Sequence, residues 1–156
     1  GKARLLQMPD LAEGSEILHS RLREDYNNKV PAVLDAIAEW AHLTDVVAEA
    51  LNKHDYTTVE KALRRNFELR CQVCAATVSA KNRRMVELAG SLGAAAKLTG
   101  SGGAIIGVYH DEKHFDKLKA LFAENQIEIV KPKIVTNGES ESDWGDSSPR
   151  GSKKEL

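Results

Sequence analysis

The chain has 156 residues, of which 42% are hydrophobic and 29% are charged, and its formal net charge is −1. This length and composition predict one soluble globular domain, and the near-neutral charge argues against bulk electrostatic binding of nucleic acid or of a membrane surface. No apolar run is long enough to span a bilayer and no signal peptide is visible, but the chain begins at Gly1, so we expect a fragment or a processed piece.

Residues 1–29 are expected to form an irregular lead-in with one short helix around Ser15–Tyr26. From residue 30 onward, apolar residues recur every three or four positions, which predicts a long amphipathic helix with Pro31 in its first turn. After a turn at residues 52–56, Thr57 and Glu60 have the spacing of a capping box. They predict a second amphipathic helix that reaches about residue 80 and packs antiparallel to the first.

Two cysteines, Cys71 and Cys74, fall within this second helix. Two cysteines cannot build a disulfide framework, so we expect a reducing compartment and a cytoplasmic location. Their Cys-x-x-Cys spacing is a weak redox or metal signal, because no strand precedes it and no second ligand pair follows. Cys74 lies on the apolar stripe and is expected to pack in the core. The five histidines also lack metal-ligand spacing, so we predict no metal site.

Asn82 is predicted to cap a third, shorter helix, which Gly93 ends. Residues 94–99 and 104–109 are predicted strands on either side of a glycine-rich turn. Asp111 is then predicted to cap one more helix.

The chain returns as a strand at residues 127–135, where Pro132 favours a sheet edge because proline has no N–H to donate. Residues 136–156 are rich in serine, glycine and mixed charge, and are expected to be a disordered tail. The folded domain is therefore predicted at residues 30–135. Its order of helices and strands predicts an α+β class, with helices covering one face of a small antiparallel sheet.

The turn between the two predicted strands is the most informative segment of the chain. Its glycines let a ligand approach the backbone closely, and successive N–H groups in such a turn can form a concave anion site. A lysine and two hydroxyls would add charge and donors, which suggests phosphate binding. The residues concerned are Lys97, Thr99, Gly100, Ser101, Gly102 and Gly103.

A purely conformational hairpin is the alternative interpretation of this turn, and the spacing by itself favours it. The segment is not a Walker loop, because its lysine precedes the glycines. It does not open a helix either, which argues against a dinucleotide fingerprint.

The pattern Gly-x-x-x-Lys-x-Thr-Gly-Ser-Gly-Gly, followed by an apolar run, resembles the third conserved motif of the GHMP small-molecule kinases. Similarity to the glucuronokinase branch of that family continues in the same order over NFELR (66–70), NRRMVELAGSLGAAAKLTGSGG (82–103) and KPKIV (131–135). With a weaker likeness near residues 19–23, the resemblance covers about residues 16–135. It implies a ferredoxin-like sheet packed by several helices, as in the C-terminal domain of GHMP kinases.

The resemblance also implies a function. The chain would be the C-terminal, substrate- and phosphate-binding half of an ATP-dependent sugar-1-kinase that converts D-glucuronate to D-glucuronate 1-phosphate. The ATP loop of the family, Pro-x-x-x-Gly-Leu-Gly-Ser-Ser, and its usual catalytic aspartate belong to the N-terminal kinase domain and are not found in this sequence. ATP and Mg²⁺ are therefore expected to bind mainly to that domain. This chain alone is expected to be inactive and to hold no catalytic residue.

The role of Lys97 stays open between neutralising a phosphate and pairing with a structural carboxylate. His19, Ser20 and Arg23 are candidates for contacts to the sugar acid, because an acidic sugar favours a nearby cation or helix N-terminus. An ordinary surface helix is the alternative for these three residues. Arg70 is a further candidate for binding a carboxylate.

A second function remains open, namely a non-catalytic ferredoxin-like module that binds a small ligand or regulates another chain. RNA binding by the sheet face is disfavoured, because the predicted strands lack interleaved aromatic residues and the chain has almost no net charge.

Overall fold

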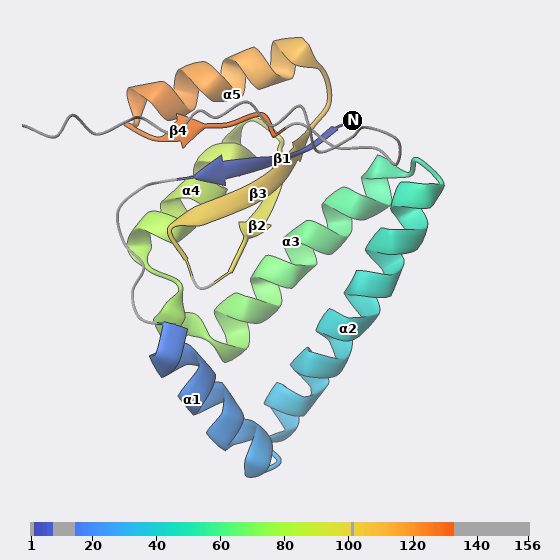
Figure 1. Cartoon of the computed structure of the whole chain (residues 1–156), viewed down its shortest axis with the longest axis vertical. Coiled ribbons are helices and arrows are strands. Elements are labelled where there is room, and N and C mark those ends of the chain that lie inside the picture. Colours follow the sequence, from blue (N-terminus) through green and yellow to red (C-terminus); the bar gives the residue numbers. More distant parts are fainter. Residues whose placement is uncertain (1, 8–14, 101, 133–156) are drawn as a thin grey trace, which may run out of the picture.

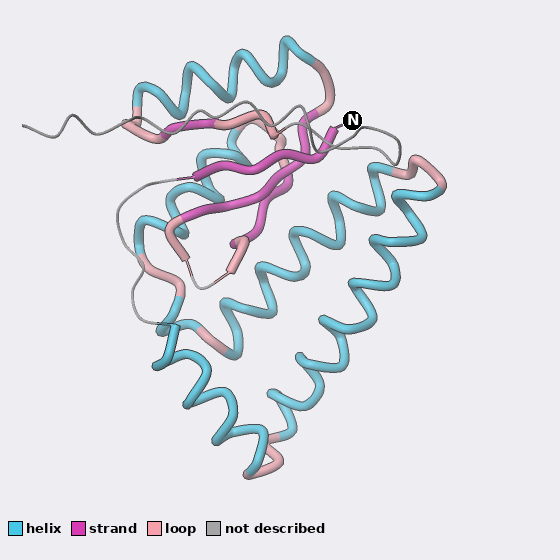
Figure 2. The backbone as a smooth tube through the Cα atoms, viewed as in Figure 1, coloured by secondary structure: helices cyan, strands magenta, loops and turns pink. Residues whose placement is uncertain are grey.

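A computed structural model describes residues 2–7, 15–100 and 102–132, which form a four-stranded antiparallel sheet surrounded by helices (Figures 1 and 2). The strands are β1 (Lys2–Gln7), β2 (Ala95–Leu98), β3 (Ala104–Tyr109) and β4 (Glu128–Ile129). The helices are α1 (Ser15–Asn27), α2 (Pro31–Asn52), α3 (Tyr56–Val73), α4 (Ala80–Ser91) and α5 (Glu112–Glu124), with a short 3₁₀ turn, η1 (Ala75–Thr77), after α3.

Strand β1 corrects the prediction that the first residues are irregular. It lies inside the sheet, whose order is β2-β3-β1-β4, and pairs with β3 from Lys2 opposite Tyr109 to Gln7 opposite Ala104. The run KARLLQ has no β-branched residue and no clear two-residue alternation, so the local pattern does not predict a strand. Its strand conformation comes from pairing with a segment near the other end of the chain.

The sheet order and the intervening helices give the ferredoxin-like arrangement, with one helical connection between β1 and β2 and another, α5, between β3 and β4. The predicted fold class, an α+β ferredoxin-like sheet packed by several helices, is confirmed. The first connection is long, because it contains α1, α2 and α3 in addition to α4. Within the described residues, no helix is both long enough and apolar enough to cross a membrane.

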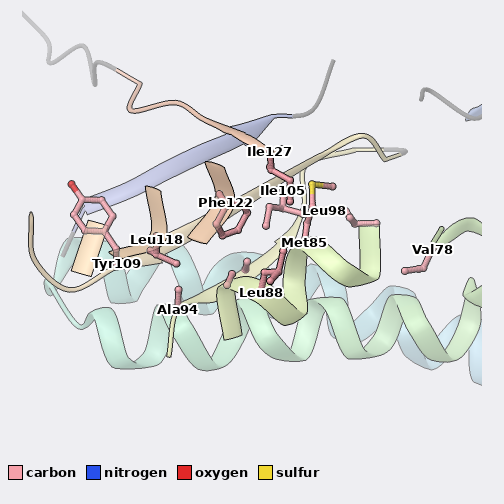
Figure 3. Close-up of a cluster of buried hydrophobic side chains, with 12 residues drawn as sticks. Val78, Met85, Leu88, Ala94, Leu98, Ile105, Tyr109, Leu118, Phe122 and Ile127 are labelled. Carbon is pink, nitrogen blue, oxygen red and sulfur yellow. The ribbon is translucent and has the colours of Figure 1, made fainter. Parts of the chain in front are cut away.

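Side chains from α4 and α5 pack on one face of the sheet and form the larger core cluster (Figure 3). Its most buried large side chains are Met85, Ile105 and Phe122. Neighbouring residues of a strand point to opposite faces, so Ala95 and Val108 face the other side. There they pack with Val59 of α3 and Ala50 of α2. Helices therefore contact both faces of the sheet, which corrects the prediction of one covered face.

The helix caps differ in part from those that the sequence predicts. Asp55, and not Thr57, caps α3, because its carboxylate accepts from the Thr58 amide at 3.1 Å. Ser79, and not Asn82, caps α4, accepting from the Asn82 amide at 3.1 Å. The second helix also ends earlier than predicted, at Val73. Asp111 caps α5 as predicted, and Pro31 occupies the first turn of α2.

Helices α2 and α3 form an antiparallel hairpin, as their short connection predicts (Figure 1). Two long-range interactions fix this pair. The Arg65 guanidinium donates to both carboxylate oxygens of Glu39, at 2.5 and 2.8 Å, and the Trp40 indole donates to the Asn66 carbonyl at 3.3 Å. The hairpin of α2 and α3 lies along the sheet, and the C-terminal end of α3 lies near the turn between β2 and β3 (Figure 1).

Strand β4 is an edge strand, in agreement with the prediction for this end of the sheet, but it spans only Glu128–Ile129. Residues 127 and 130–132 are not part of a strand, which corrects the predicted bounds of 127–135 within the described residues. The predicted strand residues 133–135 and the predicted disordered tail at residues 136–156 lie outside the described residues. The tail therefore remains a prediction.

Candidate functional site

The turn between β2 and β3 needs glycine at two positions. Gly102 has φ +147° and Gly103 has φ +77°, and residues that carry a side chain rarely adopt such backbone conformations. A Cβ on Gly102 would also lie 2.6 Å from the Asn82 side-chain nitrogen. Gly100 has no such neighbour, because a Cβ there would meet nothing within 4 Å. Ser101, the remaining residue of the predicted site, lies outside the described residues.

Asn82 holds this turn from the first turn of α4. The Gly103 amide donates to Asn82 Oδ1 at 3.0 Å, so this amide already has an acceptor within the protein. On the β2 side of the turn, the Thr99 amide and hydroxyl donate to the Ala104 carbonyl at 3.3 and 3.4 Å. The sequence assigned Asn82 to a helix cap. Ser79, three residues earlier, is an equally good N-cap residue, and this signal could have shown that Asn82 is not needed as the cap.

Arg70, near the end of α3, reaches the same turn. Its Nη1 donates to the Gly100 carbonyl at 2.7 Å, which places the guanidinium beside the glycines. Burial lowers the pKa of Arg70 below its ordinary value. The structure thus brings Arg70 to the predicted phosphate site, although the sequence offered it only as a separate carboxylate-binding candidate.

Lys97 lies in β2 between two residues of the larger core cluster, so its side chain points to the face on which α3 packs. The side chain is half-buried, and Nζ donates to the Leu98 carbonyl at 3.1 Å. Burial lowers the pKa of Lys97, and the positive charge of Arg70 lowers it further. Within the described part of the chain no carboxylate forms an ion pair with Lys97. The alternative of a structural carboxylate partner therefore gains no support.

The three remaining candidates, His19, Ser20 and Arg23, belong to α1. Ser20 and Arg23 are exposed, and the His19 side chain lies outside the described part of the structure. A groove of about 340 Å³ separates α1 from the segment that follows α3, and other residues line its α1 side: Arg21, Leu22 and Asp25. The opposite wall is formed by residues 72–77. Ser20 and Arg23 are therefore not placed in this groove.

Cys74 lines the same groove and is buried, as predicted, while Cys71 is half-buried, and both are free thiols. Burial raises the pKa of Cys74, which makes its thiolate scarce at neutral pH. The described residues contain no group of three or more histidine, cysteine, aspartate or glutamate side chains that could hold a metal ion. The charged groups at the glycine turn are the cations Lys97 and Arg70, which suit an anion and not a metal ion.

Comparison with known proteins identifies relatives of this arrangement. The model of the family described as "GHMP kinases C terminal" matches residues 47–127. Probable glucuronokinase 2 of Arabidopsis thaliana is 38% identical over 90 residues, which cover 57% of this chain and 25% of that protein. Glucuronokinase 1 of the same plant is 30% identical over 90 residues, which cover the same fractions of the two chains. The matched part of the chain thus spans a quarter of the length of these curated relatives.

Solved structures with the same fold include a Lin0012 protein from Listeria innocua, with a TM-score of 0.72 and 13% identity. L. major mevalonate kinase in complex with R-mevalonate has a TM-score of 0.69 and 16% identity. The matches cover 83% and 78% of this chain, respectively, and 38% of each of those chains. At these identities the likeness concerns the fold alone. The family is shown by the match of the family model to residues 47–127, about half of the chain, so the chain belongs to the GHMP kinase family, as a C-terminal domain of that family.

Proposed function

We propose that this chain is the C-terminal, substrate- and phosphate-binding part of an ATP-dependent sugar kinase that phosphorylates D-glucuronate at its anomeric oxygen. The two plant relatives named glucuronokinases support the substrate class. The proposed site consists of Lys97, Thr99, Gly100, Ser101, Gly102 and Gly103, with Arg70 beside them. His19, Ser20 and Arg23 remain proposed sugar contacts.

One observation carries the proposal. Lys97 and Arg70 are both partly buried, their charges repel each other, and both lie at the glycine turn. Partly buried positive charges are unfavourable unless an anion compensates them. Within the described residues, no carboxylate pairs with Lys97. A phosphate or a sugar carboxylate beside Lys97 would supply that negative charge.

The proposed reaction is a phosphoryl transfer. The anomeric hydroxyl oxygen of the sugar forms a bond to the γ-phosphorus of ATP, the bond from that phosphorus to the β,γ-bridging oxygen breaks, and the hydroxyl proton is released as ADP leaves. Such a transfer depends on positioning and on compensating the charge of the moving group. Lys97 would supply positive charge, and the turn would hold the phosphoryl oxygens close to the backbone.

ATP and Mg²⁺ are proposed to bind mainly to an N-terminal kinase domain. The described residues of this chain do not fit Mg²⁺, which prefers carboxylate and phosphate oxygens, because the donors at the turn are positive or neutral. No step of the reaction is therefore assigned to a metal held by this chain. We also place the protein in the cytoplasm, where its two free thiols, Cys71 and Cys74, would remain reduced.

A chimera tests this proposal. The 90-residue segment of probable glucuronokinase 2 that matches this chain is replaced by the corresponding residues of this chain. We expect the chimera to form D-glucuronate 1-phosphate from ATP and D-glucuronate. Lys97→Met in the chimera should lower kcat by about 10²–10³-fold, the range for loss of one group that stabilises transition-state charge. The 156-residue chain alone should form no product.

Lys119→Met is the matched control, because Lys119 is exposed on α5, a helix on the other side of the sheet. Its kcat should stay within about twofold of the parent chimera, since surface changes away from a site have small effects. Full activity of the Lys97→Met chimera would contradict the charge-compensating role. Activity with other sugar acids but not with D-glucuronate would show that the substrate is wrong.

A further inference from the structure

We propose that Asn82 is a positioning residue that holds the glycine turn in its binding geometry. Asn82 is 4% exposed, and it is the one buried polar or charged residue among the residues that the structure describes. A buried amide is unfavourable unless its polar atoms form hydrogen bonds, so such a residue needs a structural or functional reason. The reason here is the hydrogen bond from the Gly103 amide to Asn82 Oδ1, at 3.0 Å.

The backbone of Asn82 is itself fixed before its side chain acts on the turn. Its amide donates to Ser79 Oγ at 3.1 Å, which anchors the residue in the first turn of α4. The side chain then joins this helix to Gly103 of the turn, 21 positions later in the sequence. Ser79, Asn82 and Gly103 thus form one chain of hydrogen bonds from a rigid helix to the turn.

Contact between Asn82 and Gly102 explains why the turn cannot carry a side chain there. A Cβ on Gly102 would lie 2.6 Å from Asn82 Nδ2, a distance that would push the two groups apart. The φ of +147° at Gly102 disfavours a side chain independently. A side chain at position 102 is therefore disfavoured twice, by contact with the Asn82 amide and by the backbone conformation of the turn.

The turn is held at a second point by another helix. Arg70 of α3 donates to the Gly100 carbonyl, while Asn82 of α4 accepts from the Gly103 amide. Two helices thus fix the two ends of the glycine segment. Because the Gly103 amide is used by Asn82, the contribution of Gly103 to anion binding is to shape the turn and not to donate to the anion.

The first test measures the hydrogen bond directly in the unmodified 156-residue chain. Labelled with ¹⁵N and ¹³C, the chain should show a scalar coupling across the hydrogen bond between the Gly103 nitrogen and the Asn82 side-chain carbonyl carbon. Absence of this coupling, together with rapid exchange of the Gly103 amide with solvent, would overturn the proposal. This measurement needs no variant, so a folding defect cannot obscure it.

Three variants extend the test by amide hydrogen exchange. Asn82→Ala removes the acceptor and should speed the exchange of the Gly103 amide by about tenfold, the effect of losing one ordinary hydrogen bond. Asn82→Asp keeps an acceptor oxygen and should preserve the protection. Asn52→Ala, at an exposed asparagine at the end of α2, should leave it unchanged. Equal exchange rates in the parent chain and in a folded Asn82→Ala variant would contradict the positioning role.

A last measurement separates positioning from simple stabilisation, and it rests on the proposed function. Inorganic phosphate is titrated into the parent chain and into the Asn82→Ala and Asn52→Ala variants, at a temperature where all are folded. Asn82→Ala should weaken phosphate binding by about tenfold, and the control should bind as the parent does. If the parent binds no phosphate, the proposed anion site fails, while the coupling and exchange results still decide the role of Asn82. Unchanged affinity in Asn82→Ala would overturn the positioning role.

Discussion

Lys97 carries a charge in surroundings that disfavour it, and this is the main physical feature of the site at the scale of single residues. Burial and the neighbouring Arg70 both lower its pKa, so both make the protonated lysine less stable in the folded chain. Arg70 cannot relieve the repulsion by losing its proton, because a guanidinium stays protonated under all ordinary conditions even where burial lowers its pKa. An anion bound between or beside the two side chains would reverse the effect and raise the lysine pKa.

The pH dependence of stability tests this account of Lys97. The pKa of Lys97 in the folded chain lies below the ordinary 10.5. At pH values between these two pKa values, the unfolded chain binds more protons at this residue than the folded chain does. Stability therefore rises with pH in that window. We expect the unfolding free energy of the parent chain, minus that of Lys97→Met, to increase as the pH approaches 10.5. Urea unfolding at several pH values measures it.

A difference that stays flat, or that falls with rising pH, would show that the folded chain does not disfavour the charged lysine. Saturating phosphate should reduce the increase, because the bound anion favours the charged form. Lys119→Met, at the exposed control position on α5, controls for the loss of a lysine side chain in the same unfolding measurements.

Strand β2 determines the packing at the scale of secondary-structure elements. Its residues lie between α4 on one face and α3 on the other, and two of its four residues, Ala95 and Ala96, are alanine. Small side chains let both helical layers approach the strand closely. Gly107 of β3 is constrained within the sheet, since a Cβ there would lie 2.8 Å from the Ala95 carbonyl oxygen of the neighbouring strand.

Enlarging Ala95 tests this close packing. The residue is 0% exposed and contacts the cluster that contains Val59 and Val108. Ala95→Leu should destabilise the chain by about 1–3 kcal/mol, the usual range for overpacking a core. Ala120→Leu, at an exposed position of α5, should change stability by less than about 0.5 kcal/mol. Thermal or urea unfolding of both variants gives the comparison, and equal stabilities would contradict a tightly packed strand.

At the scale of the whole molecule, β1 joins parts of the fold that are distant in sequence. It pairs with β3 on one side and with β4 on the other, where Leu6 lies opposite Ile129. Among the described strands, β4 has no other partner. The four-stranded sheet therefore forms only when β1, near the start of the chain, pairs with β4. Such non-local pairing is slow to form but stabilises the fold once made.

Removing residues 1–7 tests this role of β1. Without its partner, β4 should lose its hydrogen-bonded pairing, and β3 should become an edge strand, so we expect a lower unfolding midpoint and faster amide exchange in β3. Removal of residues 136–156 is the matched truncation. If the predicted disordered tail contributes nothing to the core, the midpoint should not change. Equal midpoints for the chain with and without β1 would contradict its role in the sheet.

The α-helices and the β2–β3 hairpin could be predicted because their signals are local. The periodicity of α2, the position of Pro31 and the cap at Asp111 all act within a few residues. Local signals were ambiguous at the start of α4, where Ser79 and Asn82 are both good caps. Tertiary contact with the glycine turn decides between them, because only Asn82 reaches Gly103.

The sequence by itself determined the α+β class, most of the helices, the glycine turn and the family resemblance, since periodicity, turn chemistry and motif order are properties of short segments. Only the tertiary structure placed β1 within the sheet, Arg70 and Lys97 at one turn, and Asn82 beneath it. Those relations join residues far apart along the chain. They arise from strand pairing and core packing, which no local pattern encodes.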